Sequence, residues 1–250
     1  MVKYTYGWKK QSLDHRDLQY EAHPVDIRNA VDLRPQMPAV YDQGQIGSCV
    51  ANATAGAFHY SRIAQSLPNW TPSRLFIYWN ARNYEGTADQ DSGCECRDGV
   101  KSVAQIGVCS ELDWAYNVNQ FATKPPATAY ADAIHAKATQ YYAVPQKLEH
   151  ILSCLNHKLP VIFGSSVFQS FEGQYVASTG NVSMPGPTDA PIGGHAQLIV
   201  GWKPENQTFI VRNSWGAGWG DHGYSYFPRD YILSPSLSSD FWSIFLTSRN

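Results

Sequence analysis

Residues 42–51 read DQGQIGSCVA and place one cysteine, Cys49, directly after a turn that contains two glycines. The run that follows, ANATAGAFHYSRIAQ, carries Ala, Phe and Ile at helical spacing, so we expect a helix over 49–65 that begins at the cysteine. A cysteine at this place has two interpretations. It is a small buried hydrophobe, or it is a nucleophile whose thiolate is favoured by a helix N-terminus. The stretch alone leaves both open.

The composition is that of a globular protein and excludes some functions. Of the 250 residues, 43% are hydrophobic and 16% are charged, and the formal net charge is −2. No block of basic residues stands out, so we expect no nucleic-acid partner. The length allows either one large domain or two closely packed lobes.

The start of the chain and its apolar runs bear on where the protein works. Residues 1–17, MVKYTYGWKKQSLDHRD, lack the apolar core of a secretory signal. Runs such as LPVIFGSSVF are too short to span a bilayer. We therefore expect no membrane partner, and a protein that is cytoplasmic or exported by a signal-independent route. We also expect a monomer.

The five cysteines allow three arrangements. An odd count without an export signal favours reduced thiols. A Cys96–Cys109 bridge is the alternative if the protein works outside a reducing cytosol. The pair Cys94 and Cys96 with Cys109 suggests zinc, but no fourth ligand lies at a recognisable spacing, so we expect neither a metal nor another cofactor.

The order of the expected elements favours an α+β fold, because helices come first and strands later. A Pro-containing segment, 121–130, is expected to cross between two halves. The expected helices lie at 49–65, 73–86, 98–107 and 147–158. The expected strands lie at 160–167, 195–202, 208–215, 223–231 and 241–248.

Three motifs occur in a fixed order: QGQIGSC at 43–49, GGHAQLIVGW at 193–202, and RNSWGAGWGDHGY at 212–224. Together they resemble the papain-like cysteine proteases of the C1 family, whose nucleophile precedes a histidine and an asparagine by 130–150 residues or so. His195 follows Cys49 by 146 residues and Asn213 follows it by 164. The resemblance covers about residues 31–247.

The resemblance implies a papain-like two-lobe fold with the active site in the cleft between the lobes. Residues 31–130 would form a mainly helical left lobe that carries the nucleophile, and 131–250 a β-barrel-like right lobe that carries the histidine and asparagine. Residues 1–30 would be an N-terminal arm or short pro-segment. Ile46 and Val50 depart from the usual family pattern, and with the short arm they resemble the bacterial and viral, xylellain-like branch.

The resemblance also assigns the catalytic roles. Cys49 would be the nucleophile and His195 its proton partner, as a thiolate–imidazolium pair. Asn213 would orient the imidazole, and Trp215 would cover that hydrogen bond and line the substrate site. Gln43 would donate its side-chain N–H, with the Cys49 backbone N–H, to the oxyanion of the tetrahedral intermediate.

The substrate site is expected from the same resemblance. Gly99 would offer its backbone to an extended peptide, as an edge strand does. Val100, Gly164, Gly194 and Ala196 would surround the pocket for the second side chain before the scissile bond. Two glycines predict a roomy, uncharged pocket for a hydrophobic side chain; ordinary packing is the alternative for all of these residues.

The implied function is a cysteine endopeptidase that hydrolyses peptide or protein substrates through a thioester acyl-enzyme. A cysteine amidase, transacylase or isopeptidase would use the same Cys–His–Asn chemistry and is the alternative. The arm, 1–30, either lies across the cleft as an intramolecular inhibitor or packs elsewhere as a permanent brace. Cleavage specificity and physiological substrate are left open by the sequence.

Overall fold

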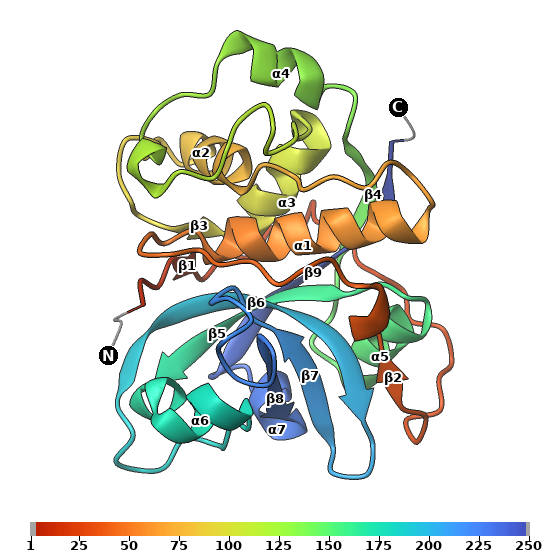
Figure 1. The fold of residues 1–250 in the computed structure, drawn as a ribbon. Coiled ribbons are helices and arrows are strands. Elements are labelled where there is room, and N and C mark those ends of the chain that lie inside the picture. The colour runs from red at the N-terminus through yellow and green to blue at the C-terminus, as the bar shows by residue number, and fades with distance from the viewer. Residues whose placement is uncertain (1–3, 249–250) are drawn as a thin grey trace.

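The computed structural model describes residues 4–248, which form a helical lobe and a β-sheet lobe packed against each other (Figure 1). Helix α1, Cys49–Ala64, lies between the other large helices and the sheet, and it is buried along nearly its whole length. The predicted α+β class with two lobes is confirmed.

Three further helices make up the helical lobe. Helix α2 begins as predicted, because the Ser73 hydroxyl accepts a hydrogen bond from the Phe76 backbone N–H at 3.2 Å. Gly86 follows its end with a φ of +71°, a backbone conformation that favours glycine. The helices are α2 (Arg74–Tyr84), α3 (Cys96–Gln105) and α4 (Ala127–Ala133).

The other lobe is built on a seven-stranded antiparallel sheet of order β4-β9-β5-β6-β7-β8, with β2 paired to β6. Its strands are β2 (Val31–Asp32), β4 (Ala138–Ala143), β5 (Val161–Phe168), β6 (Pro191–Lys203), β7 (Thr208–Arg212), β8 (Tyr224–Pro228) and β9 (Ser238–Thr247). The helices beside it are α5 (Leu148–Asn156), α6 (Gln174–Thr179) and α7 (Arg229–Leu233). Alternate residues of β5 and β6 face a core that contains Phe163 and Ile199, both fully buried.

The chain differs from expectation in three places. Strand β4 was not expected, because ATQYYA carries no apolar run; its pairing with β9 stabilises it. The segment expected to cross between the halves, 121–130, already contains the start of α4. The helical lobe was expected to start at residue 31, but β2 pairs with β6 and so belongs to the sheet.

The N-terminal arm enters the junction of the two lobes. Strand β1, Trp8–Lys9, pairs in parallel with β3, Cys94–Glu95, and forms a separate two-stranded sheet. Figure 1 shows β1 and β3 beside the N-terminal end of α1, above the large sheet. Further along, the Tyr20 and Ala143 backbones hydrogen-bond, so the arm is also tied to the edge strand β4.

All five cysteines are buried free thiols, so the Cys96–Cys109 bridge is not formed. Within residues 4–248, no helix is both long enough and apolar enough to cross a membrane. The same residues contain no cluster of three or more His, Cys, Asp and Glu side chains arranged to hold a metal ion.

Candidate active site

Cys49 is the first residue of α1, and its side chain is 0% exposed. Burial raises the pKa of its thiol, and hydrogen bonds from the backbones of Ala196 and Gly7 offset part of that shift. Ala196 belongs to the sheet lobe, whereas Gly7 belongs to the N-terminal arm. The arm therefore contacts the predicted nucleophile.

His195 lies in the middle of β6, opposite Ser165, and its Nε2 lies 2.8 Å from Asn213 Oδ1. That oxygen also accepts from the Ser214 backbone N–H at 2.8 Å, which fixes the orientation of the amide. Nε2 therefore carries the ring proton in neutral His195. Its Nδ1 has no hydrogen-bond partner in the described part of the chain and is the nitrogen left for proton exchange with the thiol.

The environment of His195 is apolar. Trp215 stacks on the imidazole at 5.0 Å between ring centroids and an interplanar angle of 25°. Burial lowers the pKa of His195 to about 4, although the hydrogen bond to Asn213 opposes the shift. In this structure His195 and Cys49 are therefore both favoured in their neutral forms.

Gln43 is fully buried and its amide is held at both ends. Its Oε1 accepts from Ser214 Oγ at 2.7 Å, so Nε2 is oriented as the donor. Nε2 donates to the Ile46 carbonyl at 3.0 Å and to the Thr5 carbonyl at 3.1 Å. A backbone carbonyl of the arm thus occupies the position where the predicted oxyanion donor would meet a substrate.

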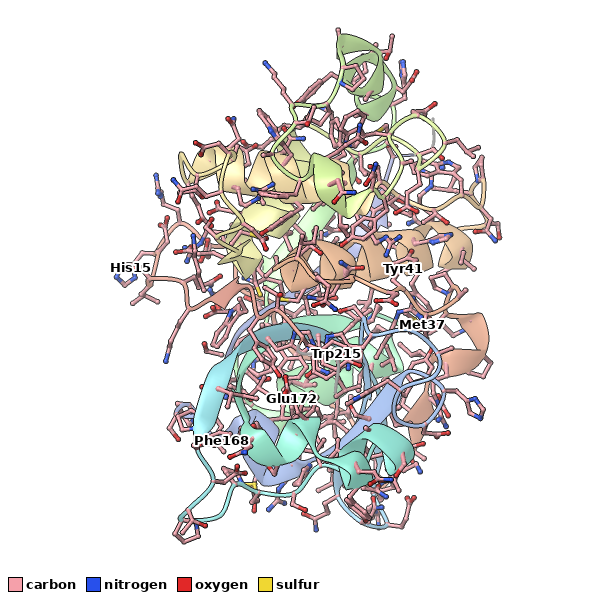
Figure 2. All side chains as sticks on the ribbon, turned by 60° about the vertical axis from the view of Figure 1, so that its left-hand side comes forward. His15, Met37, Tyr41, Phe168, Glu172 and Trp215 are labelled. Carbon is pink, nitrogen blue, oxygen red and sulfur yellow. The ribbon has the colours of Figure 1, made fainter. Side chains whose placement is uncertain are left out.

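Aromatic side chains of the arm fill the region around the histidine. Tyr4 stacks on Trp215, with centroids 3.7 Å apart and an interplanar angle of 5°. The Tyr6 ring stands edge-on to His195 at 6.0 Å, and its hydroxyl donates to Glu172 Oε1 at 2.5 Å. Figure 2 shows Trp215 and Glu172 near each other on the sheet side of the junction between the lobes.

Gly7 lets the arm approach the nucleophile turn closely. A Cβ at this position would lie 1.8 Å from the Gly47 carbonyl oxygen, and a Cβ at Gly93 would lie 2.0 Å from the Gly7 oxygen. Only glycine fits where these backbones meet. Sequence reasoning missed Thr5 and Gly7; the available signal was a glycine placed between two aromatic residues in an otherwise polar arm.

The predicted substrate pocket is occupied by Trp8. A Cβ at Gly164 would lie 2.0 Å from Trp8 Cε2, and one at Gly194 would lie 2.7 Å from Cε3, so the two glycines form the walls around the indole. We call this the glycine pocket. Ala196 is buried next to it as the strand partner of Gly164. The Trp8 Nε1–H donates to Asp240 at 2.9 Å, so the expectation of an uncharged pocket is wrong.

The role expected for Gly99 is also wrong. Gly99 lies inside α3, and a Cβ there would meet Val50 and Thr54 of α1 at 2.7 and 2.8 Å. It therefore allows two helices to pack closely, and its backbone is not a free strand edge. The edge that pairs with an extended segment is β3, which ends four residues before Gly99. Val100 follows in the same helix and is fully buried, so its part in the pocket stays a prediction.

Comparison with known proteins identifies the family. A family model described as papain family cysteine protease matches residues 23–234. The chain belongs to this family. An uncharacterized peptidase C1-like protein of Acanthamoeba polyphaga mimivirus is 43% identical over 228 residues, which are 88% of this chain and 73% of the relative.

Solved structures agree with that assignment. Xylellain, a cysteine protease from Xylella fastidiosa, superposes with a TM-score of 0.91 at 38% identity, over 96% of each chain. Digestive procathepsin L 3 of Tenebrio molitor has a TM-score of 0.73 at 21% identity, over 93% of this chain and 73% of that one, and shows the shared fold. The protein is thus a cysteine-type peptidase.

The geometry fits the roles expected for these residues in peptide-bond cleavage. The Cys49 thiol would pass its proton to His195 Nδ1 and its sulfur would attack the carbonyl carbon, while Gln43 Nε2 with the Cys49 backbone N–H would stabilise the oxyanion. His195 would give the Nδ1 proton to the leaving amine, which leaves a thioester. Water would then give a proton to His195 and attack the thioester, and the thiolate would be released. Asn213 would hold the imidazole in one orientation throughout.

Proposed function

We propose that this protein is a latent cysteine endopeptidase whose cleft segment, residues 4–12, keeps the active site closed until it is displaced. The observation that carries the proposal is the hydrogen bond from Gln43 Nε2 to the Thr5 carbonyl at 3.1 Å. A substrate carbonyl needs the same donor. Because Cys49 and His195 are 0% exposed, a substrate reaches neither side chain while the segment is bound.

The direction of the cleft segment supports an inhibitor rather than a substrate. A substrate of this family puts side chains that precede the scissile bond in the glycine pocket and its leaving amine near His195. In this chain Trp8, three residues after Thr5, fills that pocket. Tyr4, which precedes Thr5, stacks on Trp215 on the leaving-group side. The segment therefore runs opposite to a substrate, and its amide nitrogen is not placed to receive the proton.

Several contacts hold the cleft segment in place. The Cys94 backbone N–H donates to the Gly7 carbonyl at 2.9 Å. Arg97 pairs with Asp17 at 2.8 Å and donates to the Ser12 carbonyl at 2.6 Å. Each surface ion pair contributes at most about 1 kcal/mol, but a tethered segment acts at a high effective concentration. Weak individual contacts are therefore sufficient for closure.

Deleting residues 1–12 should activate the enzyme. Removal of the Thr5 carbonyl frees Gln43, and removal of Gly7 opens the approach to Cys49. We expect kcat/KM for a fluorogenic dipeptide amide to rise by roughly 10²-fold or more, on the scale that tethering provides. The measurement is the initial rate of hydrolysis at equal concentrations of active sites.

A matched control keeps the arm and changes its exposed part. Leu13 and Leu18 are 83% and 68% exposed, so replacing both with serine should leave the rate as it is in the intact chain. An unchanged rate after deletion, together with a lower Tm, would instead identify the arm as a brace and overturn the proposal.

A further inference from the structure

A buried glutamine, Gln197, lies two residues after His195 in β6. Alternate residues of a strand point to the same face of the sheet, so these two side chains share one face. The pairing of β6 with its neighbour β7 ends at Leu198 and Arg212 (Figure 1). Continuing this antiparallel register by one residue places Asn213 opposite Gln197. The Gln197 side chain therefore lies beside the amide that orients the histidine.

The Gln197 amide is buried without a hydrogen-bond partner at either end. The residue is 1% exposed, and among the described residues neither its Oε1 nor its Nε2 has a partner. Two more atoms on this face, Asn213 Nδ2 and Ser165 Oγ, are buried and unpartnered in the same part of the chain. Ser165 shares the face because it is the strand partner of His195. Native proteins seldom leave buried amides unpaired, so this group of atoms points to a bound molecule.

The hydrogen-bonding capacity of these atoms favours water as that molecule. Asn213 Oδ1 already bonds with His195 Nε2 and the Ser214 backbone N–H, so Nδ2 is left as a donor that needs an acceptor. The Gln197 amide offers both an acceptor and a donor. Water accepts from one amide and donates to the other, whereas an anion would leave the glutamine oxygen without a donor. Gln197 and Asn213 both line a cavity of about 10 Å³, about the size of one water.

We propose that Gln197 is a positioning residue for His195: through one buried water it holds the Asn213 amide, which in turn holds the imidazole. The inference rests on the roles of His195 and Asn213 in the proposed function, but the water is bound whether the cleft segment is in place or displaced. Gln197 touches neither substrate nor reacting atoms, since its strand partner Phe163 is fully buried in the core. It acts by keeping Asn213 Oδ1 aimed at the ring while the imidazole gains and loses its proton.

Crystal structures of the intact chain and of its Gln197→Met variant test the water directly. In the intact chain we expect one ordered water within hydrogen-bond distance of both Asn213 Nδ2 and the Gln197 amide. Methionine has a similar length and shape but lacks the amide, so the variant should lose that water and the single orientation of Asn213. An intact-chain structure with no water between the two amides would overturn the inference.

The same variant in the chain without residues 1–12 tests the effect on catalysis. We expect Gln197→Met to lower kcat for a fluorogenic dipeptide amide by about tenfold, because a loosened imidazole is less often aligned for proton transfer. KM should stay within about twofold, since the substrate does not contact Gln197. Both constants are measured at equal concentrations of active sites, so that a loss of folded protein does not count as a loss of turnover.

Thr54→Val is the matched control. Thr54 Oγ1 is also buried and has no hydrogen-bond partner within residues 4–248, but it lies in α1 next to Gly99. This variant should leave kcat and KM unchanged. An unchanged kcat in Gln197→Met would overturn the positioning role even with the water present. If the shortened chain hydrolysed no substrate, the proposed function would fail separately, and the orientation of Asn213 in the two crystal structures would decide the role of Gln197.

Discussion

Replacing Cys49 with alanine is expected to abolish peptide hydrolysis by the arm-deleted chain and all labelling by thiol-directed epoxides. Cys49 is the residue expected to form the thioester, and loss of a nucleophile that acts as one unit with its base costs on the order of 10⁶-fold in turnover. The substitution removes one small buried atom, so the fold should persist. The measurement is residual hydrolysis, together with mass spectrometry of the epoxide-treated protein.

The matched control is Cys154→Ala, which also removes a buried free thiol, here in α5. Burial raises the pKa of Cys154, so this thiol should be inert. Its alanine variant should retain both hydrolysis and labelling. Equal epoxide labelling in the Cys49→Ala protein would show that another cysteine reacts and would refute the assignment.

Removing the cleft segment should also change the chemical state of Cys49. In the closed chain, burial raises the pKa of the thiol and lowers that of His195 to about 4, so at pH 6 both groups are neutral. A thiol with a pKa at or above about 8.5 has roughly 0.3% thiolate or less at this pH. Once water enters, thiolate and imidazolium stabilise each other. We expect alkylation by iodoacetamide at pH 6 to accelerate by roughly 10²-fold or more.

The pH dependence of Cys49 alkylation should differ between the intact chain and the chain without residues 1–12. In the intact chain, alkylation should rise only as the pH increases through the raised pKa of the Cys49 thiol. In the chain without residues 1–12, alkylation should already be near its plateau at about pH 6, where the ion pair holds the thiolate. Two profiles of the same shape, differing only by a constant factor, would mean that the arm blocks access but leaves the ionisation of the pair unchanged.

The residues expected to be catalytic are each marked by their local sequence. Cys49 opens a helix after a glycine turn, and His195 and Asn213 stand in strand-and-turn motifs whose order is distinctive. The sheet then brings them together: pairing of β6 with β7 places the end of one strand beside the other. The order of the motifs along the chain therefore pointed to His195 and Asn213, which the structure brings within 2.8 Å of each other, although it gave no distances.

The remaining features depend on contacts between distant segments. Gly99 was expected at a strand edge, but α3 begins at Cys96 and carries it into a helix interface. Asp240 lies 232 residues from Trp8, and nothing in the local sequence marks it as part of a pocket. Strand β4 likewise depends on its partner β9 rather than on its own apolar content. Such features follow from tertiary pairing, which one sequence does not reveal.

For the arm, too, one part of the prediction came from local sequence and the other part needed tertiary contacts. Its Tyr and Trp residues suggested packing against a groove, but the choice between inhibitor and brace required the contacts of Thr5 and Gly7. The arm in fact has both kinds of contact: residues 4–12 fill the cleft, and Tyr20 reaches Ser153 of α5 at 2.7 Å. The first set is the basis of the proposed closure, and the second would keep the arm attached to the sheet lobe when the cleft segment is displaced.

The cleft segment and a substrate should occupy the same place on the protein. Hydrogen–deuterium exchange of the cleft segment tests this most directly. The intact chain is compared before and after an epoxide has alkylated Cys49, with residues 195–202 of β6 as the internal reference. We predict that labelling releases the cleft segment, so exchange in residues 4–12 rises by at least about tenfold while β6 stays protected. Persistent protection of residues 4–12 in fully labelled protein would contradict the account.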